Sequence, residues 1–166
     1  MRVRLRFAVR GLVLVALVAL PVSADAPEGQ YPEFIGQNQR IRDLKTKLVW
    51  ERSVSPAVSP SVLPSPLTFA EAGTVCTGGT RLPTLKELLS LVDEEPHFVY
   101  DLDQKKNVIK YIDRQAFGTH TPIDTGYWTS SAGSPTQAWS VDFGTGETSL
   151  ANLSDRRYVR CVRFVP

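Results

Sequence analysis

Cysteine and histidine side chains can act in catalysis and bind metals, and this sequence has two of each. Cys76 and Cys161 lack a CxxC spacing and a neighbouring histidine, so a metal pair and a reactive thiol are poor explanations for them. In an oxidising compartment, a lone pair of cysteines is best explained by one disulfide. His97 and His120 have no serine or cysteine at a recognisable catalytic spacing. The sequence therefore predicts a Cys76–Cys161 bridge and gives no signal for a catalytic triad.

Acidic side chains gather in one short stretch, and carboxylate oxygens are the ligands that calcium prefers. The candidates are Asp93, Glu95, Asp101 and Asp103. Calcium takes about six to eight oxygen ligands, however, and the sequence does not show that these four converge. Acidic side chains in loops are in most proteins simply solvated. Calcium is therefore a weak candidate, and we expect no metal and no cofactor.

Three aromatic side chains on strand-like segments are candidates for stacking on a sugar or another flat ligand. They are Tyr127, Trp128 and Trp139. In a small domain, a tryptophan on an alternating strand usually belongs to the core, so we expect Trp128 and Trp139 to be buried. Tyr127 is the ring that we expect at the surface.

A group of arginines near the C-terminus is the second candidate for ligand recognition. If Arg156, Arg157 and Arg160 are exposed together, they would receive an acidic glycan through paired contacts to carboxylate or sulfate. The competing explanation is that they pair with carboxylates of the same chain, namely Asp142, Glu147 or Asp155. The ligand-binding residues that we predict are Tyr127, Asp142, Arg156 and Arg157.

Residues 1–24 have the three regions of an export signal. Four arginines and no acid come first, the apolar run Gly11–Leu20 follows, and small residues precede a cleavage point after Ala24. About ten apolar residues are too few to cross a hydrocarbon core of about 30 Å. Cleavage removes four of the 19 basic residues, leaving 15 against 17 acids, so the formal net charge changes from +2 to −2. We expect a periplasmic or secreted product with no integral membrane segment and no affinity for nucleic acid.

The rest of the chain has the pattern of one α+β domain. We expect residues 25–39 to form a loose N-terminal segment and residues 40–166 to form the domain, with a proline- and serine-rich loop at 53–66. Two capping boxes, Thr68–Glu71 and Thr84–Glu87, predict two helices, the second of which ends near Asp93. The pattern from 94 to 126 is weak and predicts irregular chain. Strand-like runs follow at 126–131, 137–143 and 158–164.

Several motifs of this sequence occur in an order that is known from one bacterial family. The motifs are Leu48-Val-Trp50, Thr68-Phe-Ala-Glu-Ala72, Arg81-Leu-Pro-Thr-Leu-Lys-Glu-Leu88, Tyr127-Trp-Thr-Ser-Ser131 and Tyr158-Val-Arg-Cys-Val-Arg163. Over about residues 40–164 the chain resembles the Lcl C-terminal domain, which is named after a collagen-like adhesin. The resemblance implies a C-type-lectin-like fold with two short helices on antiparallel strands, adjacent terminal strands and a disulfide from the first helix to the last strand.

The resemblance also implies a function in binding. In the adhesin, the domain is associated with recognition of surface glycans, but a shared fold does not by itself transfer a function. This chain departs from the adhesin because it has no collagen-like stem and carries the insertion at 53–66. We expect an exported binding module for a glycan or a surface protein. The alternative is a structural or assembly component of the envelope, and an enzyme is a distant third, since the oxidases of this fold need a reactive cysteine pair.

Overall fold

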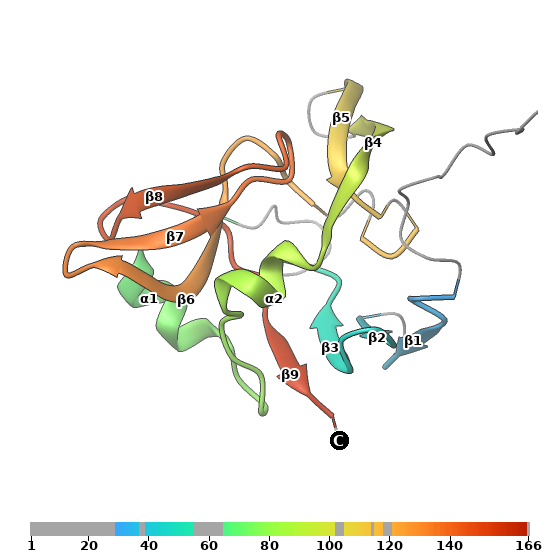
Figure 1. Ribbon diagram of the computed structural model, residues 1–166, viewed down its shortest axis with the longest axis horizontal. Helices are drawn as coiled ribbons and strands as arrows, with labels where there is room; N and C mark the ends of the chain where they lie inside the picture. The colour runs from blue at the N-terminus through green and yellow to red at the C-terminus, as the bar shows by residue number, and fades with distance from the viewer. Residues whose placement is uncertain are drawn as a thin grey trace, which may run out of the picture.

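The computed structural model describes residues 29–36, 39–54, 65–101, 105–113, 115–117 and 121–165. The predicted leader, residues 1–24, lies outside these ranges, and so does most of the predicted loop at 53–66. Three antiparallel sheets and two short helices make up the described part (Figure 1). Among the described residues, no helix combines the length and the apolar character that crossing a membrane requires.

The first sheet joins the two ends of the domain. Its strands are β1 (Glu33–Ile35), β2 (Arg40–Asp43), β3 (Leu48–Glu51) and β9 (Val162–Phe164), in the order β1-β2-β3-β9. All neighbours are antiparallel, so the early strand β3 lies beside the last strand, as the resemblance implies. We call this four-stranded sheet the terminal sheet. The segment expected to be loose, 25–39, contributes β1 to its edge.

The two helices begin where the capping boxes predict them. In α1 (Phe69–Val75) and α2 (Leu85–Leu89), the N-cap threonine accepts a hydrogen bond from the N3 amide, and the N3 glutamate accepts one from the N-cap amide. The second helix is shorter than expected: it ends at Leu89, and a strand begins at Val92. Arg81 fixes its start, because both terminal nitrogens of its guanidinium donate to the carboxylate of Glu87 at 2.6 and 2.8 Å.

A disulfide connects the first helix to the last strand. Cys76 is the C-cap residue of α1 and Cys161 directly precedes β9, and their Cα atoms are 5.6 Å apart. The bond closes a loop of 85 residues, for which chain entropy gives a stabilisation of about 4–5 kcal/mol. The predicted bridge is confirmed.

The segment from 94 to 126, which we expected to be irregular, instead begins with a long β-hairpin. Its strands are β4 (Val92–Asp101) and β5 (Lys106–Ile112). The register shifts between Val92 and His97, so the residues around Pro96 form a bulge that tolerates the missing proline donor. The hairpin projects at the top of the molecule, away from the terminal sheet (Figure 1). Its base is tied to the domain by the Tyr111 amide, which donates to the Phe143 carbonyl at 2.8 Å.

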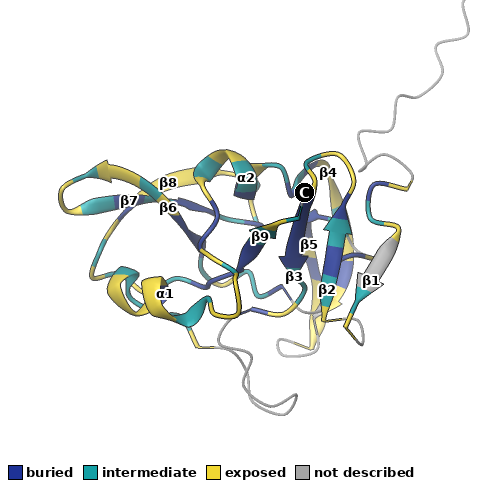
Figure 2. Cartoon of the chain, turned by 90° about the horizontal axis from the view of Figure 1, so that it is seen from below, coloured by how far each residue is buried: buried dark blue, intermediate teal, exposed yellow. Residues whose placement is uncertain are grey.

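The third sheet is formed by the strand-like runs of the C-terminal half. Its order is β6 (Tyr127–Ser134), β7 (Gln137–Val141) and β8 (Thr148–Asn152). One face of this sheet packs on α1, and the cluster between them includes Ala72, Trp128, Ala138, Val159 and Cys161. The larger core cluster lies beneath the terminal sheet and α2 and includes Trp50, Leu88, Ile112, Phe117 and Val162. Buried residues accordingly concentrate on β3, where Leu48, Val49 and Trp50 are all buried (Figure 2).

Candidate functional site

Tyr127 lies in the core, so the expectation that its ring faces solvent is wrong. Its side chain is fully buried, packs edge-on against Phe143 at a centroid distance of 5.0 Å, and donates its hydroxyl to the Pro122 carbonyl. Burial raises the pKa of Tyr127 well above its ordinary value. Trp128 is buried as predicted, with its Nε1 donating to the Leu67 carbonyl at 2.8 Å. Neither ring can stack on a ligand.

Arg160 is also buried, which removes it from the predicted arginine group. Its guanidinium donates to the Glu51 carbonyl at 2.7 Å, to the Arg52 carbonyl and to Thr121 Oγ1 at 2.8 Å. The same group lies over the ring of Phe117, 4.9 Å from its centroid. Arg160 therefore ties strand β3 to the loop that follows the hairpin, and its role is structural.

Arg156 and Arg157 lie at the surface, and each has a carboxylate partner in the same chain. Arg156 Nη1 is 3.5 Å from Glu71 Oε2, and Arg157 Nη2 is 3.9 Å from Asp155 Oδ2. Arg157 also donates to Thr125 Oγ1 at 3.0 Å. The pairing with Asp155 was the competing explanation for this group, whereas Glu71 comes from α1 and is far away in the sequence.

Asp142 serves a turn in the structure. Its Oδ1 accepts a hydrogen bond from the Gly144 amide at 2.7 Å, and its carbonyl accepts one from the Gly146 amide at 2.8 Å. Gly146 has a φ of 75°, which this turn between β7 and β8 requires. In the described part of the chain, no hydrogen bond or ion pair connects Asp142 with Arg156 or Arg157. Of the four predicted ligand-binding residues, Tyr127 is buried, whereas Asp142, Arg156 and Arg157 stay a prediction.

The acidic stretch does not form a calcium cage in the described residues. Asp93 is buried, and its Oδ2 lies 3.0 Å from His97 Nε2, whereas Glu95 is exposed. Asp103 and the side chain of Asp101 lie outside the described residues. Within those ranges, no group of three or more histidine, cysteine, aspartate or glutamate side chains is arranged to hold a metal ion.

The hairpin carries a cluster of exposed apolar side chains that the sequence pattern did not reveal. Phe98, Tyr100 and Ile109 are 70%, 52% and 42% exposed. Phe98 and Tyr100 are two residues apart on β4, and Ile109 lies directly opposite Phe98 on β5, so the three share one face. Asn107, opposite Tyr100, lies on the same face and is exposed. We call these four residues the hairpin face.

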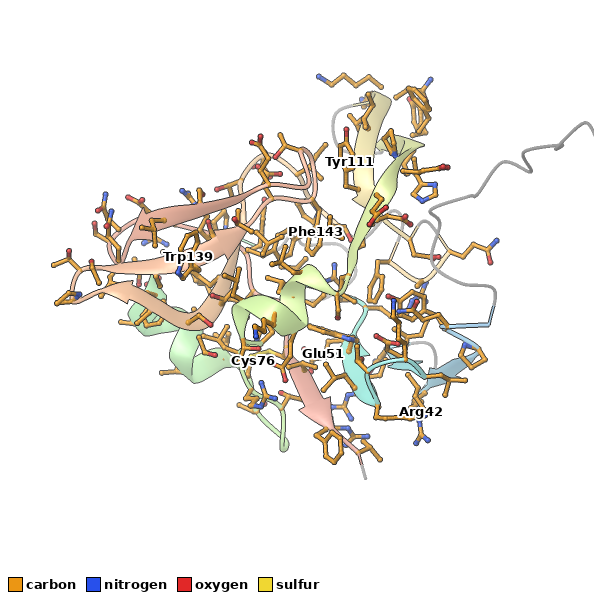
Figure 3. All side chains as sticks on the ribbon, viewed as in Figure 1. Arg42, Glu51, Cys76, Tyr111, Trp139 and Phe143 are labelled. Carbon is orange, nitrogen blue, oxygen red and sulfur yellow. A yellow bond between two sulfur atoms is a disulfide. The ribbon has the colours of Figure 1, made fainter. Side chains whose placement is uncertain are left out.

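The inner side of the hairpin, by contrast, is buried. Val99 and Val108, which also face each other across the two strands, are 5% and 9% exposed. Lys110 is buried on this inner side and donates its Nζ to the Thr121 carbonyl at 2.7 Å. Tyr111 follows Ile109 on the outer side, and at the base of the hairpin its ring lies beside the turn between β7 and β8 (Figure 3). The inner side of the hairpin is therefore covered along its length, whereas the other side is covered only at the base, beside Tyr111.

Trp139 is only partly buried, contrary to the expectation that it belongs to the core. Strand β7 turns Ala138 and Ser140 inward, so Trp139 lies on the opposite face of the sheet (Figure 3). Its cross-strand partner is Leu150, which is exposed. Burial alternates on β7, so the register turns Trp139 outward, whereas on β6 the consecutive residues Tyr127 and Trp128 are both buried.

The comparisons with known proteins assign the chain to one family. No curated protein matches the chain. The family model of the Lcl C-terminal domain matches residues 39–163, from the start of β2 to β9. The match spans the disulfide, both helices, the hairpin and all three sheets except β1. The chain therefore belongs to the Lcl C-terminal domain family, a family of unknown function.

Proposed function

We propose that this chain is an exported binding module that recognises a glycan through the hairpin face. The observation that carries the proposal is the exposure of Phe98, Tyr100 and Ile109 together on one side of a projecting hairpin. Leaving large apolar side chains in water costs free energy, and a group of them on one face is typical of a binding surface.

The composition of the hairpin face fits a carbohydrate. It carries no charged side chain, and it combines two aromatic rings with a phenol hydroxyl and a carboxamide. Sugars present apolar C–H faces together with hydroxyl groups, so they need rings for stacking and neutral polar groups for hydrogen bonds. A nearby charge is not required.

The size of the hairpin face argues against the alternative of an envelope assembly component. Aromatic side chains bury about 150–250 Å² each, so the exposed parts of Phe98, Tyr100 and Ile109 together offer roughly 300 Å². A stable protein interface needs about 800 Å² on each partner. The face is large enough for a few sugar rings but small for permanent assembly.

Export is supported by the chemistry of the two cysteines and by the leader sequence. The Cys76–Cys161 disulfide is typical of oxidising compartments, and residues 1–24 have the order of a cleavable export signal. Periplasmic or secreted placement would bring the hairpin face into contact with envelope or extracellular glycans.

A glycan array tests the proposal. The protein is applied with and without a calcium chelator, beside Phe98→Ala, Tyr100→Ala and a matched control, Phe164→Ala, which removes an equally exposed ring elsewhere. We expect chelator-independent binding that is lost in the two hairpin variants and kept in the control. Absence of binding to every glycan, or equal loss in all variants, would contradict the proposal and favour an assembly role.

Arg156 and Arg157 stay a separate prediction for an acidic ligand. Arg156 is the more exposed of the two, and its pairing with Glu71 at 3.5 Å is weak at the surface. On the same array, Arg156→Ala would weaken binding only if the recognised glycans carry carboxylate or sulfate groups. Loss of binding to neutral glycans in this variant would show that the hairpin face is not sufficient.

A further inference from the structure

One end of the terminal sheet gathers exposed apolar side chains. Leu44 begins the turn between β2 and β3, and Phe164 ends β9. Because Phe164 pairs with Leu48, the first residue of β3, the turn and the end of β9 lie at the same end of the sheet. Leu44 is 41% exposed and Phe164 is 61% exposed. This end is opposite to the hairpin, at the bottom of Figure 1, where the C-terminus lies.

Four basic side chains lie at the same end of the sheet. Lys45 and Lys47 are exposed in the turn. Arg42 and Arg163 lie in one row of the sheet, on either side of Val49, and are half-buried. Because Arg163 and Phe164 are consecutive on β9, the row that holds Arg42 and Arg163 is on the opposite face of the sheet from Phe164. In the described part of the chain, the buried Nε atoms of both arginines have no hydrogen-bond partner. We call Arg42, Leu44, Lys45, Lys47, Arg163 and Phe164 the basic end.

Among the side chains that the structure describes, no ion pair joins an acid to the basic end. Asp43 is the one acid of residues 42–47, and it is fully buried and accepts hydrogen bonds from the Lys45 amide at 2.8 Å and from Thr46 Oγ1 at 2.6 Å. Residues 162–165 contain no acid. Glu51 is at the other end of β3, 4.0 Å from Arg40. Glu33 lies opposite Arg42 in register, and its side chain is outside the described residues.

We propose that the basic end docks on the surface of an anionic lipid bilayer. Exposed Leu44 and Phe164 would enter the interface between headgroups and acyl chains, while the four cations would meet the lipid phosphates. Lysines are mobile, strongly hydrated point charges, so Lys45 and Lys47 suit a diffuse layer of charge better than one shaped ligand. The hairpin would then project from the end of the molecule that is away from the membrane (Figure 1).

Vesicle flotation tests this proposal independently of any glycan. The protein is purified in the form that cells accumulate, and its N-terminus is identified by mass spectrometry, so that all variants carry the same leader state. It is then mixed with vesicles of phosphatidylcholine alone or with added phosphatidylglycerol. We expect flotation only with the anionic vesicles. Each removed cation should lower the partition coefficient about fivefold, so Lys45→Gln with Lys47→Gln should lower it about 25-fold.

Two further variants make the test decisive. The control pair Lys86→Gln and Lys105→Gln removes two exposed lysines elsewhere, and Lys105 shares with Lys47 a positive φ, 51° against 62°. This pair should leave flotation unchanged. Leu44→Ser with Phe164→Ser should weaken flotation but not retention on a soluble polyanion such as heparin. The proposal is overturned if anionic vesicles do not bind, if the control pair loses as much, or if the apolar variants float like the parent.

Discussion

Phe98 and Ile109 lie directly opposite each other across the β4–β5 hairpin, and both face solvent. The next cross-strand pair, Val99 and Val108, is turned inward and buried. A two-stranded hairpin with one covered side normally places polar residues on its free side. Here the free side is apolar over three positions, so packing within this domain does not explain the choice of residues.

The hairpin face can be altered without loss of folding. Because the exposed side chains make few contacts, Phe98→Ser and Tyr100→Ser should change the free energy of unfolding by less than about 0.5 kcal/mol. Urea denaturation followed by fluorescence measures this. Val99→Ser, one residue away on the buried side, is the matched control and should cost about 1–3 kcal/mol. Strong destabilisation by Phe98→Ser would mean that the face is covered within the protein.

The disulfide should contribute much of the stability of the domain. Replacing Cys76 and Cys161 together by serine opens the loop of 85 residues and should lower the free energy of unfolding by about 2–5 kcal/mol. Reduction of the parent protein should have the same effect, since the contribution comes from the bond. If the serine variant and the reduced protein unfold at the urea concentration of the oxidised parent, the bridge is not structural.

Arg160 should be far more important for folding than its neighbours Arg156 and Arg157. Arg160→Ala leaves two carbonyls and Thr121 Oγ1 without their buried donor, which should cost about 3–5 kcal/mol. Arg156→Ala removes a surface ion pair and an exposed hydrogen bond to the Pro66 carbonyl, and should cost less than about 1 kcal/mol. Equal urea midpoints for the two variants would contradict the buried role assigned to Arg160.

The start of α2 should respond to pH through Glu87. The hydrogen bond from Arg81 holds the pKa of Glu87 below its ordinary value of 4.5, and the amide of Thr84 adds to this effect. A lowered pKa in the folded state means that the stabilisation is complete above 4.5 and is lost as the pH falls through the folded value. The difference in unfolding free energy between the parent and Glu87→Gln should therefore shrink at pH 3.

The control for this experiment is Glu147→Gln, which changes an exposed carboxylate that has no ion pair in the described part of the chain. Its effect on stability should be small at both pH values. If the Glu87→Gln difference stayed constant from pH 7 to pH 3, the Arg81–Glu87 contact would not hold the carboxylate in its charged form.

The sequence is sufficient for features that local chemistry determines. Thr68 and Thr84 predict both helix starts, because a capping box satisfies backbone donors within four residues. The two cysteines predict the bridge, and the ordered motifs predict the family. These signals do not depend on how distant strands are placed.

Features that depend on strand register could not be predicted in the same way. Trp139 is on the alternating strand β7, whereas Tyr127 and Trp128 are consecutive on β6 and both buried, and only the finished sheet shows that Trp139 alone is partly exposed. The sequence did not predict the hairpin, because Pro96 and the acids before it suggest a loop. In the structure, the strand accommodates them in a bulge. An apolar face that is left in water by the fold has no local signature at all.

Hydroxyl-radical footprinting with envelope polysaccharide as the added ligand tests the binding role of the hairpin face most directly. Phe98, Tyr100 and Phe164 are all exposed and reactive rings, so each reports on its own surface in one sample. If the account is right, the polysaccharide protects Phe98 and Tyr100 from oxidation and leaves Phe164 unprotected. Unchanged oxidation of Phe98 and Tyr100, or equal protection of Phe164, would contradict it.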